Sequence, residues 1–322
     1  MSLINLTNND TANIYPLWYF LNDSLMIIGN IIGISVAILF IFTIIRLDHP
    51  SYSISNLIVC NTSLAIGLSS IIMLINACYA LKSDFNGTGY IDSSCILRGA
   101  FLNIFYIYMY ASLCLKAFNR CRCIVYYTNP TLTSYRCLTI IILLQLLLAV
   151  CITLIIVLTN GIDYDVGSHL CLITTKKSYQ FIFTMTIYYI SILFISSVYL
   201  YILYYVSHLP LLERCRRKRQ LALLRRILIL LIMLIIPGLF STFLIIHWFF
   251  FGSIPSYSFK IRSLLDTIGY TGSIITIFIS HTKIRNQYYP RKKLPVNKLV
   301  LKKCELIVLK EPLRSQNKLV YI

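Results

Sequence analysis

Charged residues are scarce in this sequence. Only 12% of its 322 residues are charged, whereas 58% are hydrophobic. Soluble domains carry about 25% charged residues, so the composition excludes an ordinary soluble protein and indicates a membrane protein. The net charge of +18 does not indicate nucleic-acid binding, because the basic residues fall in the gaps between apolar runs, where membrane topology puts them.

Motifs of catalysis and metal binding are also missing. The eleven cysteines include no CxxC pair and no histidine neighbours, so no metal framework is predicted. The five histidines are scattered, and neither HExxH nor GxSxG occurs. We therefore expect that the protein is not an enzyme and has neither a metal nor another cofactor.

Long apolar runs dominate the chain instead. Seven of them are near or above the ~20 residues that a membrane-spanning helix needs. They cover residues 17–45, 52–81, 96–127, 137–158, 179–207, 227–251 and 258–280. The sequence therefore predicts an all-α, seven-transmembrane helix bundle over residues 17–282. Residues 1–16 form an N-terminal segment without Lys or Arg, unlike a cleaved signal peptide, and residues 283–322 form a basic tail.

The basic residues predict the orientation of the bundle. With the N-terminus outside, sixteen basic residues of the loops and early tail lie on the inner side and six on the outer side. The positive-inside rule favours this arrangement, with the tail in the cytoplasm. Three glycosylation sequons, at Asn5, Asn9 and Asn86, fall on the same outer side and are candidate glycosylation sites.

The third run holds the chain's most informative spacing. As a helix, the stretch from Cys95 to Arg120 covers roughly 37 Å, close to the ~40–45 Å of a bilayer with its headgroups. The two residues are therefore expected at opposite membrane faces. Cys171 lies in the loop after the fourth run, on the same side as Cys95, and we expect these two to form a disulfide. The alternative is that Cys78 pairs with either one.

Three further features concern the helices themselves. Gly29 and Asn30 predict close packing of the first helix, with Asn30 facing the bundle. Pro237 interrupts the sixth run and predicts a kink that serves as a hinge; the alternative is a proline without a hinge role.

A basic cluster precedes the sixth run. Its charges are predicted to anchor the helix to the anionic inner leaflet, and also to contact an intracellular partner. It comprises Arg216, Arg217, Lys218 and Arg219.

Together these residues resemble a rhodopsin-like (class A) G-protein-coupled receptor over roughly residues 17–290. The resemblance rests on the spacing between Cys95 and Arg120, with Asn119-Arg120-Cys121 as a degenerate copy of the family's Asp-Arg-Tyr motif. Gly29-Asn30, Pro237 and Cys171 also match family positions. The chain departs from the family elsewhere: Ile66 replaces the second-helix acid, Ile235 replaces the toggle tryptophan, and the seventh helix has no Asn-Pro-x-x-Tyr.

The resemblance implies a multi-pass receptor of the plasma membrane. An extracellular ligand would shift the bundle between two states, the inner end of the sixth helix would move outward, and Arg120, with Asn119 beside it, would contact a heterotrimeric G protein. Two alternatives stay open. The chain is a seven-span carrier or channel for small solutes, or it is a receptor-like protein without G-protein coupling.

The ligand site is predicted from one helical face. Leu102, Asn103 and Tyr106 share a face of the third helix, and His247, Trp248, Asp266 and Tyr270 are candidates to join them in a pocket. Leu102 stands where amine receptors carry an aspartate, which argues against a biogenic amine. No lysine follows Lys260 in the seventh run, which argues against retinal. A peptide or a chemosensory molecule remains.

Lys116 is the most unusual charge, one turn before Arg120. We expect its side chain to reach the inner interface; the alternative is that it repels Arg120 and disfavours a locked state. Asn119 stands where the family has an acid, so it offers a hydrogen bond but no ion pair. We therefore expect a weakly latched inactive state and raised basal signalling.

Overall fold

The structure is a computed structural model in which residues 15–47, 54–86, 94–125, 135–165, 168–173, 178–208, 214–252, 255 and 257–280 are described. Several earlier predictions lie outside these residues, namely those for Asn5, Asn9 and the tail 283–322. The side chain of Asn86 and those of residues 216–219 are also outside the description, although helices pass through these positions.

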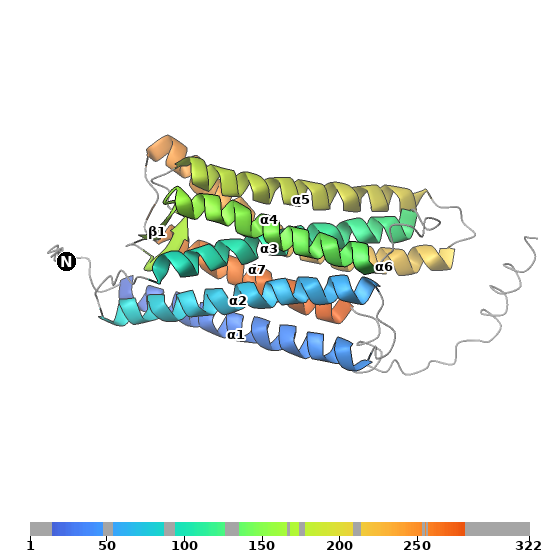
Figure 1. Ribbon diagram of the computed structural model, residues 1–322, viewed down its shortest axis with the longest axis horizontal. Coiled ribbons are helices and arrows are strands. Elements are labelled where there is room, and N and C mark those ends of the chain that lie inside the picture. Colours follow the sequence, from blue (N-terminus) through green and yellow to red (C-terminus); the bar gives the residue numbers. More distant parts are fainter. Residues whose placement is uncertain are drawn as a thin grey trace, which may run out of the picture. The chain divides into compact units, whose positions relative to one another are not determined.

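Seven helices make up most of the described part of the chain, arranged as Figure 1 shows. They are α1 Tyr15–Leu47, α2 Ile54–Asn86, α3 Cys95–Val125, α4 Tyr135–Leu158, α5 Ser178–Ser207, α6 Arg214–Phe251 and α7 Ser258–Ser280. All seven are long and apolar enough to cross a membrane. The predicted seven-helix, all-α architecture is therefore confirmed.

Helix α6 extends well beyond its apolar run. The run begins at Ile227, but the helix begins at Arg214. The added residues read RCRRKRQLALLRR, and Arg, Lys, Gln, Leu and Ala are all good helix formers. Hydropathy therefore marks the spanning part of α6, whereas helix propensity sets its true start.

The polarity of the bundle is inverted relative to that of a soluble protein. Leucines on α4 are 57–60% exposed, namely Leu143, Leu144, Leu147 and Leu148. By contrast, Asn22, Asn30 and Asn61 are at most 6% exposed. In a bilayer the apolar side chains face lipid, whereas polar groups must find partners inside the bundle. The side-chain distribution therefore fits a membrane protein.

Helix α3 lies at the centre of the arrangement. It contacts α2, α4 and α5, while α7 contacts α1, α2 and α6. A polar cluster joins α2 to α3: Asn61 Nδ2 donates to Ser112 Oγ at 3.0 Å, and the hydroxyl of Tyr108 donates to Asn61 Oδ1. Because these bonds are buried, they fix the register of the two helices.

A small hairpin between α4 and α5 is the part that the sequence did not predict. Strands β1 (Ile162–Asp165) and β2 (Leu170–Ile173) pair antiparallel, with Tyr164 opposite Cys171. The hairpin contacts α3, and β2 also contacts α2. We call this the hairpin end of the bundle; α1, α3 and α7 begin there, and α2 ends there (Figure 1).

Candidate functional site

A cavity lies beneath the hairpin, between α3, α5 and α7. It contains about 630 Å³ of empty space, its mouth included. Residues of all three helices, of α2 and of strand β2 line it: Met73, Gly99, Leu102, Asn103, Tyr106, Cys171, Leu172, Ile173, Phe181, Thr184, Met185, Arg262, Ser263, Asp266 and Tyr270. Most of these side chains are apolar or aromatic, as in typical ligand sites.

Two opposite charges enter this cavity from α7. Arg262 and Asp266 lie one turn apart, with 3.9 Å between Arg262 Nε and Asp266 Oδ2. Their side chains are 17% and 13% exposed. The Arg262 guanidinium lies over the ring of Phe181 on α5, 5.5 Å from its centroid. The pair therefore presents a cation and an anion side by side in a largely apolar wall.

Tyrosines pack beside the charged pair. The ring of Tyr106 makes an edge contact with Tyr110, with 4.9 Å between centroids, and Tyr110 makes another with Tyr188 at 5.1 Å. Tyr106 and Tyr270 line the same cavity as Asp266. This cluster links the cavity wall on α3 and α7 to α5.

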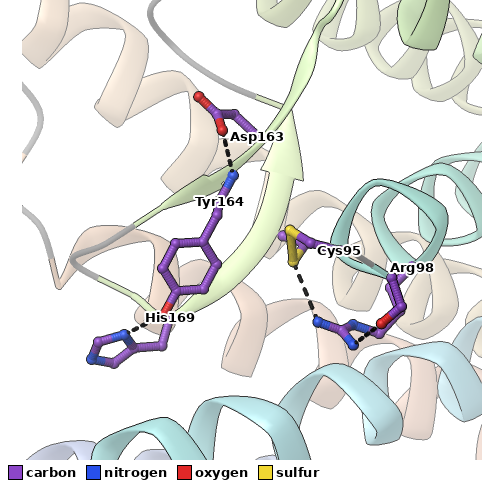
Figure 2. Close-up of a disulfide and its surroundings, with 7 residues drawn as sticks. Cys95, Arg98, Asp163, Tyr164 and His169 are labelled. Carbon is purple, nitrogen blue, oxygen red and sulfur yellow. Dashed lines mark hydrogen bonds between the residues drawn. A yellow bond between two sulfur atoms is a disulfide. The ribbon is translucent and has the colours of Figure 1, made fainter. Parts of the chain in front are cut away.

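A disulfide holds the hairpin on α3, as Figure 2 shows. Cys95 and Cys171 are bonded, with 5.4 Å between their Cα atoms. The predicted pairing is therefore confirmed, and the alternative with Cys78 is excluded because Cys78 is a free, exposed thiol. Gly99 makes the close approach possible, since a Cβ at that position would collide with Ile162 of β1.

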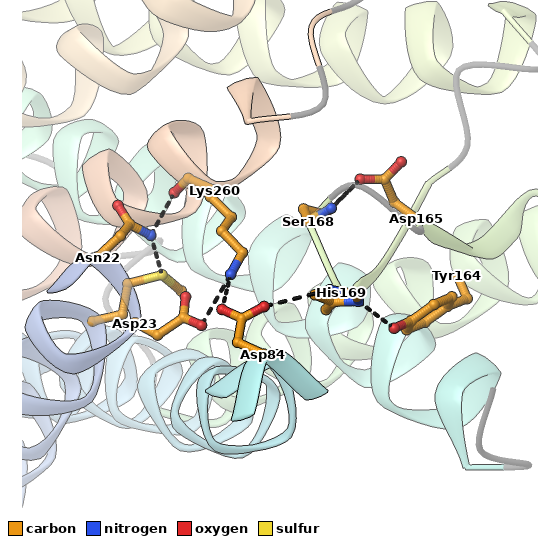
Figure 3. Close-up of polar contacts among 9 residues, drawn as sticks. Asn22, Asp23, Asp84, Tyr164, Asp165, Ser168, His169 and Lys260 are labelled. Carbon is orange, nitrogen blue, oxygen red and sulfur yellow. Dashed lines mark hydrogen bonds and ion pairs between the residues drawn. The ribbon is translucent and has the colours of Figure 1, made fainter. Parts of the chain in front are cut away.

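Buried charges form a second cluster at the hairpin end, shown in Figure 3. Lys260 Nζ on α7 donates to Asp23 Oδ2 on α1 at 3.1 Å and also pairs with Asp84 on α2. Lys260 and Asp23 have no exposed side-chain surface. The Lys260 ammonium also lies over the ring of Tyr19, 4.3 Å from its centroid. One lysine thus ties three helices together through two carboxylates.

His169 extends this cluster to the hairpin. Its Nε2 atom is 3.4 Å from Asp84 Oδ1, and its Nδ1 atom shares a hydrogen bond of 2.7 Å with the Tyr164 hydroxyl. Burial lowers the pKa of His169 below its ordinary 6.5, and the attraction of Asp84 only partly opposes this. The hairpin is therefore joined to α2 by a histidine whose neutral form is favoured by burial.

Helices α5, α6 and α7 approach closely around Pro237. The Tyr188 hydroxyl donates to the carbonyl of Leu234 at 2.8 Å. Pro237 has no N–H, so the carbonyl of Met233 loses its helical donor. A Cβ on Gly269 of α7 would lie 3.0 Å from that carbonyl oxygen. The proline region of α6 is therefore packed against both neighbours rather than facing lipid alone.

Two cations lie near the opposite end of α3. Lys116 is only 7% exposed, so its side chain is buried and does not reach the interface as expected from the sequence. Arg120 Nη1 is buried and has no hydrogen-bond partner in the part of the chain that the structure describes, and the two like charges repel each other. Among the described residues, no carboxylate pairs with either cation. Asn119 beside them is partly exposed.

The first helix is fastened to the seventh at Gly29 and Asn30. Asn30 is fully buried, and its Nδ2 atom donates to Met26 O at 2.8 Å and to Thr267 Oγ1 at 3.2 Å. Thr271 Oγ1 donates to the carbonyl of Gly29 at 2.9 Å. A Cβ on Gly29 would lie 2.8 Å from the Thr267 methyl carbon, so this contact depends on glycine.

The structure brings together five of the seven residues predicted to form a ligand pocket. Leu102, Asn103, Tyr106, Asp266 and Tyr270 line the cavity; that a ligand contacts them stays a prediction.

His247 and Trp248 do not line the cavity, which corrects their predicted placement. The ring of His247 instead packs on its own helix, against Phe243 and Phe251, at centroid distances of 6.3 and 4.6 Å. These two phenylalanines are 58% and 71% exposed, so this face of α6 points away from the bundle.

Sequence reasoning also missed cavity residues, above all Arg262. The only available signal was its positive charge, one helical turn before Asp266 on the same face of α7. Phe181 and Met185 of α5 repeat one turn apart, but a membrane helix offers such apolar spacing on every face, so it carried no signal.

Comparisons with known proteins identify the fold of this chain. No protein-family model matches the chain, and no curated protein matches its sequence. The crystal structure of squid rhodopsin is similar over 86% of this chain and 87% of that chain, with a TM-score of 0.61 and 16% sequence identity. At this identity the likeness defines the fold. The chain is a multi-pass membrane protein with the rhodopsin-like seven-helix fold of G-protein-coupled receptors.

Proposed function

We propose that this chain is a G-protein-coupled receptor of the plasma membrane. A ligand enters the cavity beneath the hairpin, and a heterotrimeric G protein binds at the opposite end of the bundle. One observation carries the proposal: a rhodopsin-like fold has an open cavity at one end and, at the other, an arginine of α3 whose Nη1 atom has no hydrogen-bond partner among the described residues. The partners are inferred from that fold, and the sites from this chain's own residues.

The hairpin end is proposed to face the extracellular side. Arg46 and Arg122 lie in the last turns of α1 and α3 at the opposite end, where positive-inside bias puts the cytoplasm. The disulfide between Cys95 and Cys171 supports this orientation, because structural disulfides persist in oxidising compartments. The cavity is then open to ligands from outside.

The opposite end supplies the proposed contact with the G protein. The Nη1 donor of the Arg120 guanidinium is unused among the described residues. The neighbouring Asn119 side chain is neutral, so it cannot form an ion pair with Arg120. The basic start of α6 adds cations close to the inner leaflet, where anionic lipids and partner carboxylates attract them. Arg216, Arg217, Lys218 and Arg219 are proposed to serve both.

Pro237 is proposed as the hinge that connects the two ends. Tyr188 of α5 bonds the Leu234 carbonyl one turn before Gly238, and its ring reaches the tyrosine cluster of the cavity through Tyr110. A ligand that moves these rings would therefore change the support of α6 at its weakest backbone point. An outward movement of the inner part of α6 would then expose Arg120.

The test compares the wild type with Arg120→Ala at equal surface expression. Recruitment of G proteins is measured in cells without added ligand. We expect basal recruitment that disappears in the variant, because the arginine would be the contact. Arg122→Ala is the matched control, since it removes a cation from the same turn of α3 and should leave most recruitment intact.

Unchanged recruitment in Arg120→Ala would refute this role. If the wild type recruits nothing, solute flux is measured in proteoliposomes. Flux would favour a carrier or channel, whereas the absence of both activities at normal surface display would favour a receptor-like protein without coupling.

A further inference from the structure

The two charged groups of the cavity have unused hydrogen-bonding capacity. In the described part of the chain no donor makes a hydrogen bond to the Asp266 carboxylate, and no acceptor makes one to the Arg262 guanidinium; their mutual distance of 3.9 Å is too long for a hydrogen bond. Both side chains are largely buried, at 13% and 17% exposure. The ion pair therefore keeps donor and acceptor capacity for a charged ligand in the cavity.

The spacing of the pair selects a ligand with two adjacent charges. In an α-amino acid the ammonium nitrogen and the carboxyl carbon are about 2.5 Å apart, given the bond lengths and angle at Cα. Such a ligand beside Arg262 and Asp266 gives four alternating charges, with the carboxylate next to Arg262 and the ammonium group next to Asp266. A carboxylate also matches the planar fork of a guanidinium. A ligand with a single charge would use only one of the two residues.

The remaining wall selects the rest of the ligand. Leu102, Phe181, Met185 and Ile173 are apolar and line the same cavity. Phe181 also lies under the Arg262 guanidinium, so the charged and apolar parts of the wall are contiguous. An apolar side chain attached next to the ligand's charges would therefore be buried against these residues.

We propose that the cavity binds a free α-amino acid with an apolar side chain, whose ammonium group pairs with Asp266 and whose carboxylate pairs with Arg262. The proposal rests on the proposed function, because it takes this cavity to be the receptor's ligand site. A peptide terminus carries only one of the two charges next to its side chain. The site therefore distinguishes a free amino acid from the end of a peptide.

The experiment measures binding to the purified full-length chain in lipid nanodiscs, without any G protein. The probes are L-phenylalanine, L-leucine and L-methionine, each beside its amide and its N-acetyl derivative. The amide keeps only the ammonium group and resembles a peptide N-terminus; the N-acetyl derivative keeps only the carboxylate and resembles a C-terminus. We expect at least one free amino acid to bind, and both of its derivatives to bind about 10- to 100-fold more weakly, since each loses one charge-assisted contact.

Two variants assign the charges. Arg262→Gln should weaken binding of the free amino acid to the affinity of its amide, and the affinity of the amide itself should hardly change. Asp266→Asn should weaken it to the level of the N-acetyl derivative. A misfolded variant would lose all three probes together, so this pattern separates recognition from folding. Arg262→Lys, which keeps the cation, should restore part of the preference for a carboxylate.

Three results would overturn the proposal: saturable binding by none of the three amino acids, equal affinity for an amino acid and its derivatives, or correctly folded variants that change all probes alike. Because binding is measured without a G protein, these results are independent of the Arg120→Ala recruitment experiment. A chain that binds amino acids but recruits nothing would keep this inference while removing the proposed coupling.

Discussion

The imidazole of His169 lies 3.4 Å from the carboxylate of Asp84, and this contact joins the hairpin to α2. Four groups from three elements face the histidine: Asp84 of α2, Lys260 of α7, and Tyr164 and Asp165 of β1. Burial outweighs the attraction of the acids, so the pKa of His169 is lowered. The folded hairpin therefore favours the neutral imidazole.

Acid should therefore weaken the folded state. A histidine with a lowered pKa binds fewer protons when folded than when unfolded, so stability is fully present above about pH 6.5 and falls as the pH drops from there toward the folded-state pKa. Thermal unfolding of the purified chain between pH 8 and pH 5 measures this. His169→Asn should flatten the profile in that range, whereas His208→Asn, at an exposed histidine, should not. Equal losses of stability on acidification in the wild type and in His169→Asn would contradict the prediction.

Lys260 should be among the most sensitive positions for stability. Lys260→Met leaves the buried Asp23 carboxylate without its cation, and breaking a buried pair in this way costs about 3–5 kcal/mol. Adding Asp23→Asn should recover part of the loss, because the buried negative charge is then removed as well. The exposed Lys82 provides the control, since Lys82→Met should change the unfolding temperature little. Equal effects at both lysines would contradict the structural role of this cluster.

The charge cluster also shows where sequence reasoning ends. Asp23, Asp84 and Lys260 come from three helices, and Asp23 and Lys260 are 237 positions apart. No local spacing connects such residues, and each alone reads as an interfacial charge. Hydropathy could identify the spans because lipid selects the composition of each helix separately. It carries no information about which polar residues meet across the bundle.

Part of the cavity could be predicted from helical periodicity. Leu102 and Tyr106 lie one turn apart on α3, so helical periodicity alone places them on one face. The same rule failed for His247, because a face of α6 can be aromatic toward lipid as easily as toward a pocket. The disulfide was predictable because two cysteines shared one side of the membrane, whereas the hairpin that it holds left no hydropathy signal in its short strands.

Gly238 should not accept a side chain. A Cβ there would overlap the Tyr188 phenol, and moving that ring breaks its bond to the Leu234 carbonyl. Gly238→Ala should therefore destabilise the fold by about 1–3 kcal/mol, as expected for overpacking. Gly272→Ala is the matched control, because its new methyl group would meet only the flexible Met233 side chain at 3.3 Å. Thermal unfolding that is equally affected by both substitutions would argue against close packing of Tyr188.

Asn119→Asp should lower basal signalling. Position 119 is three residues after Lys116 and adjacent to Arg120, so a carboxylate there adjoins two cations that have no acidic partner among the described residues. Suppose that this pairing stabilises the inactive state, in which Arg120 is held, and that the stabilisation is about 1 kcal/mol. The ratio of active to inactive receptor then falls roughly fivefold. Basal G-protein recruitment at matched surface display measures this ratio. Asn119→Leu, of similar size but uncharged, should not lower it; equal recruitment by both variants would mean that the missing acid does not set the basal state.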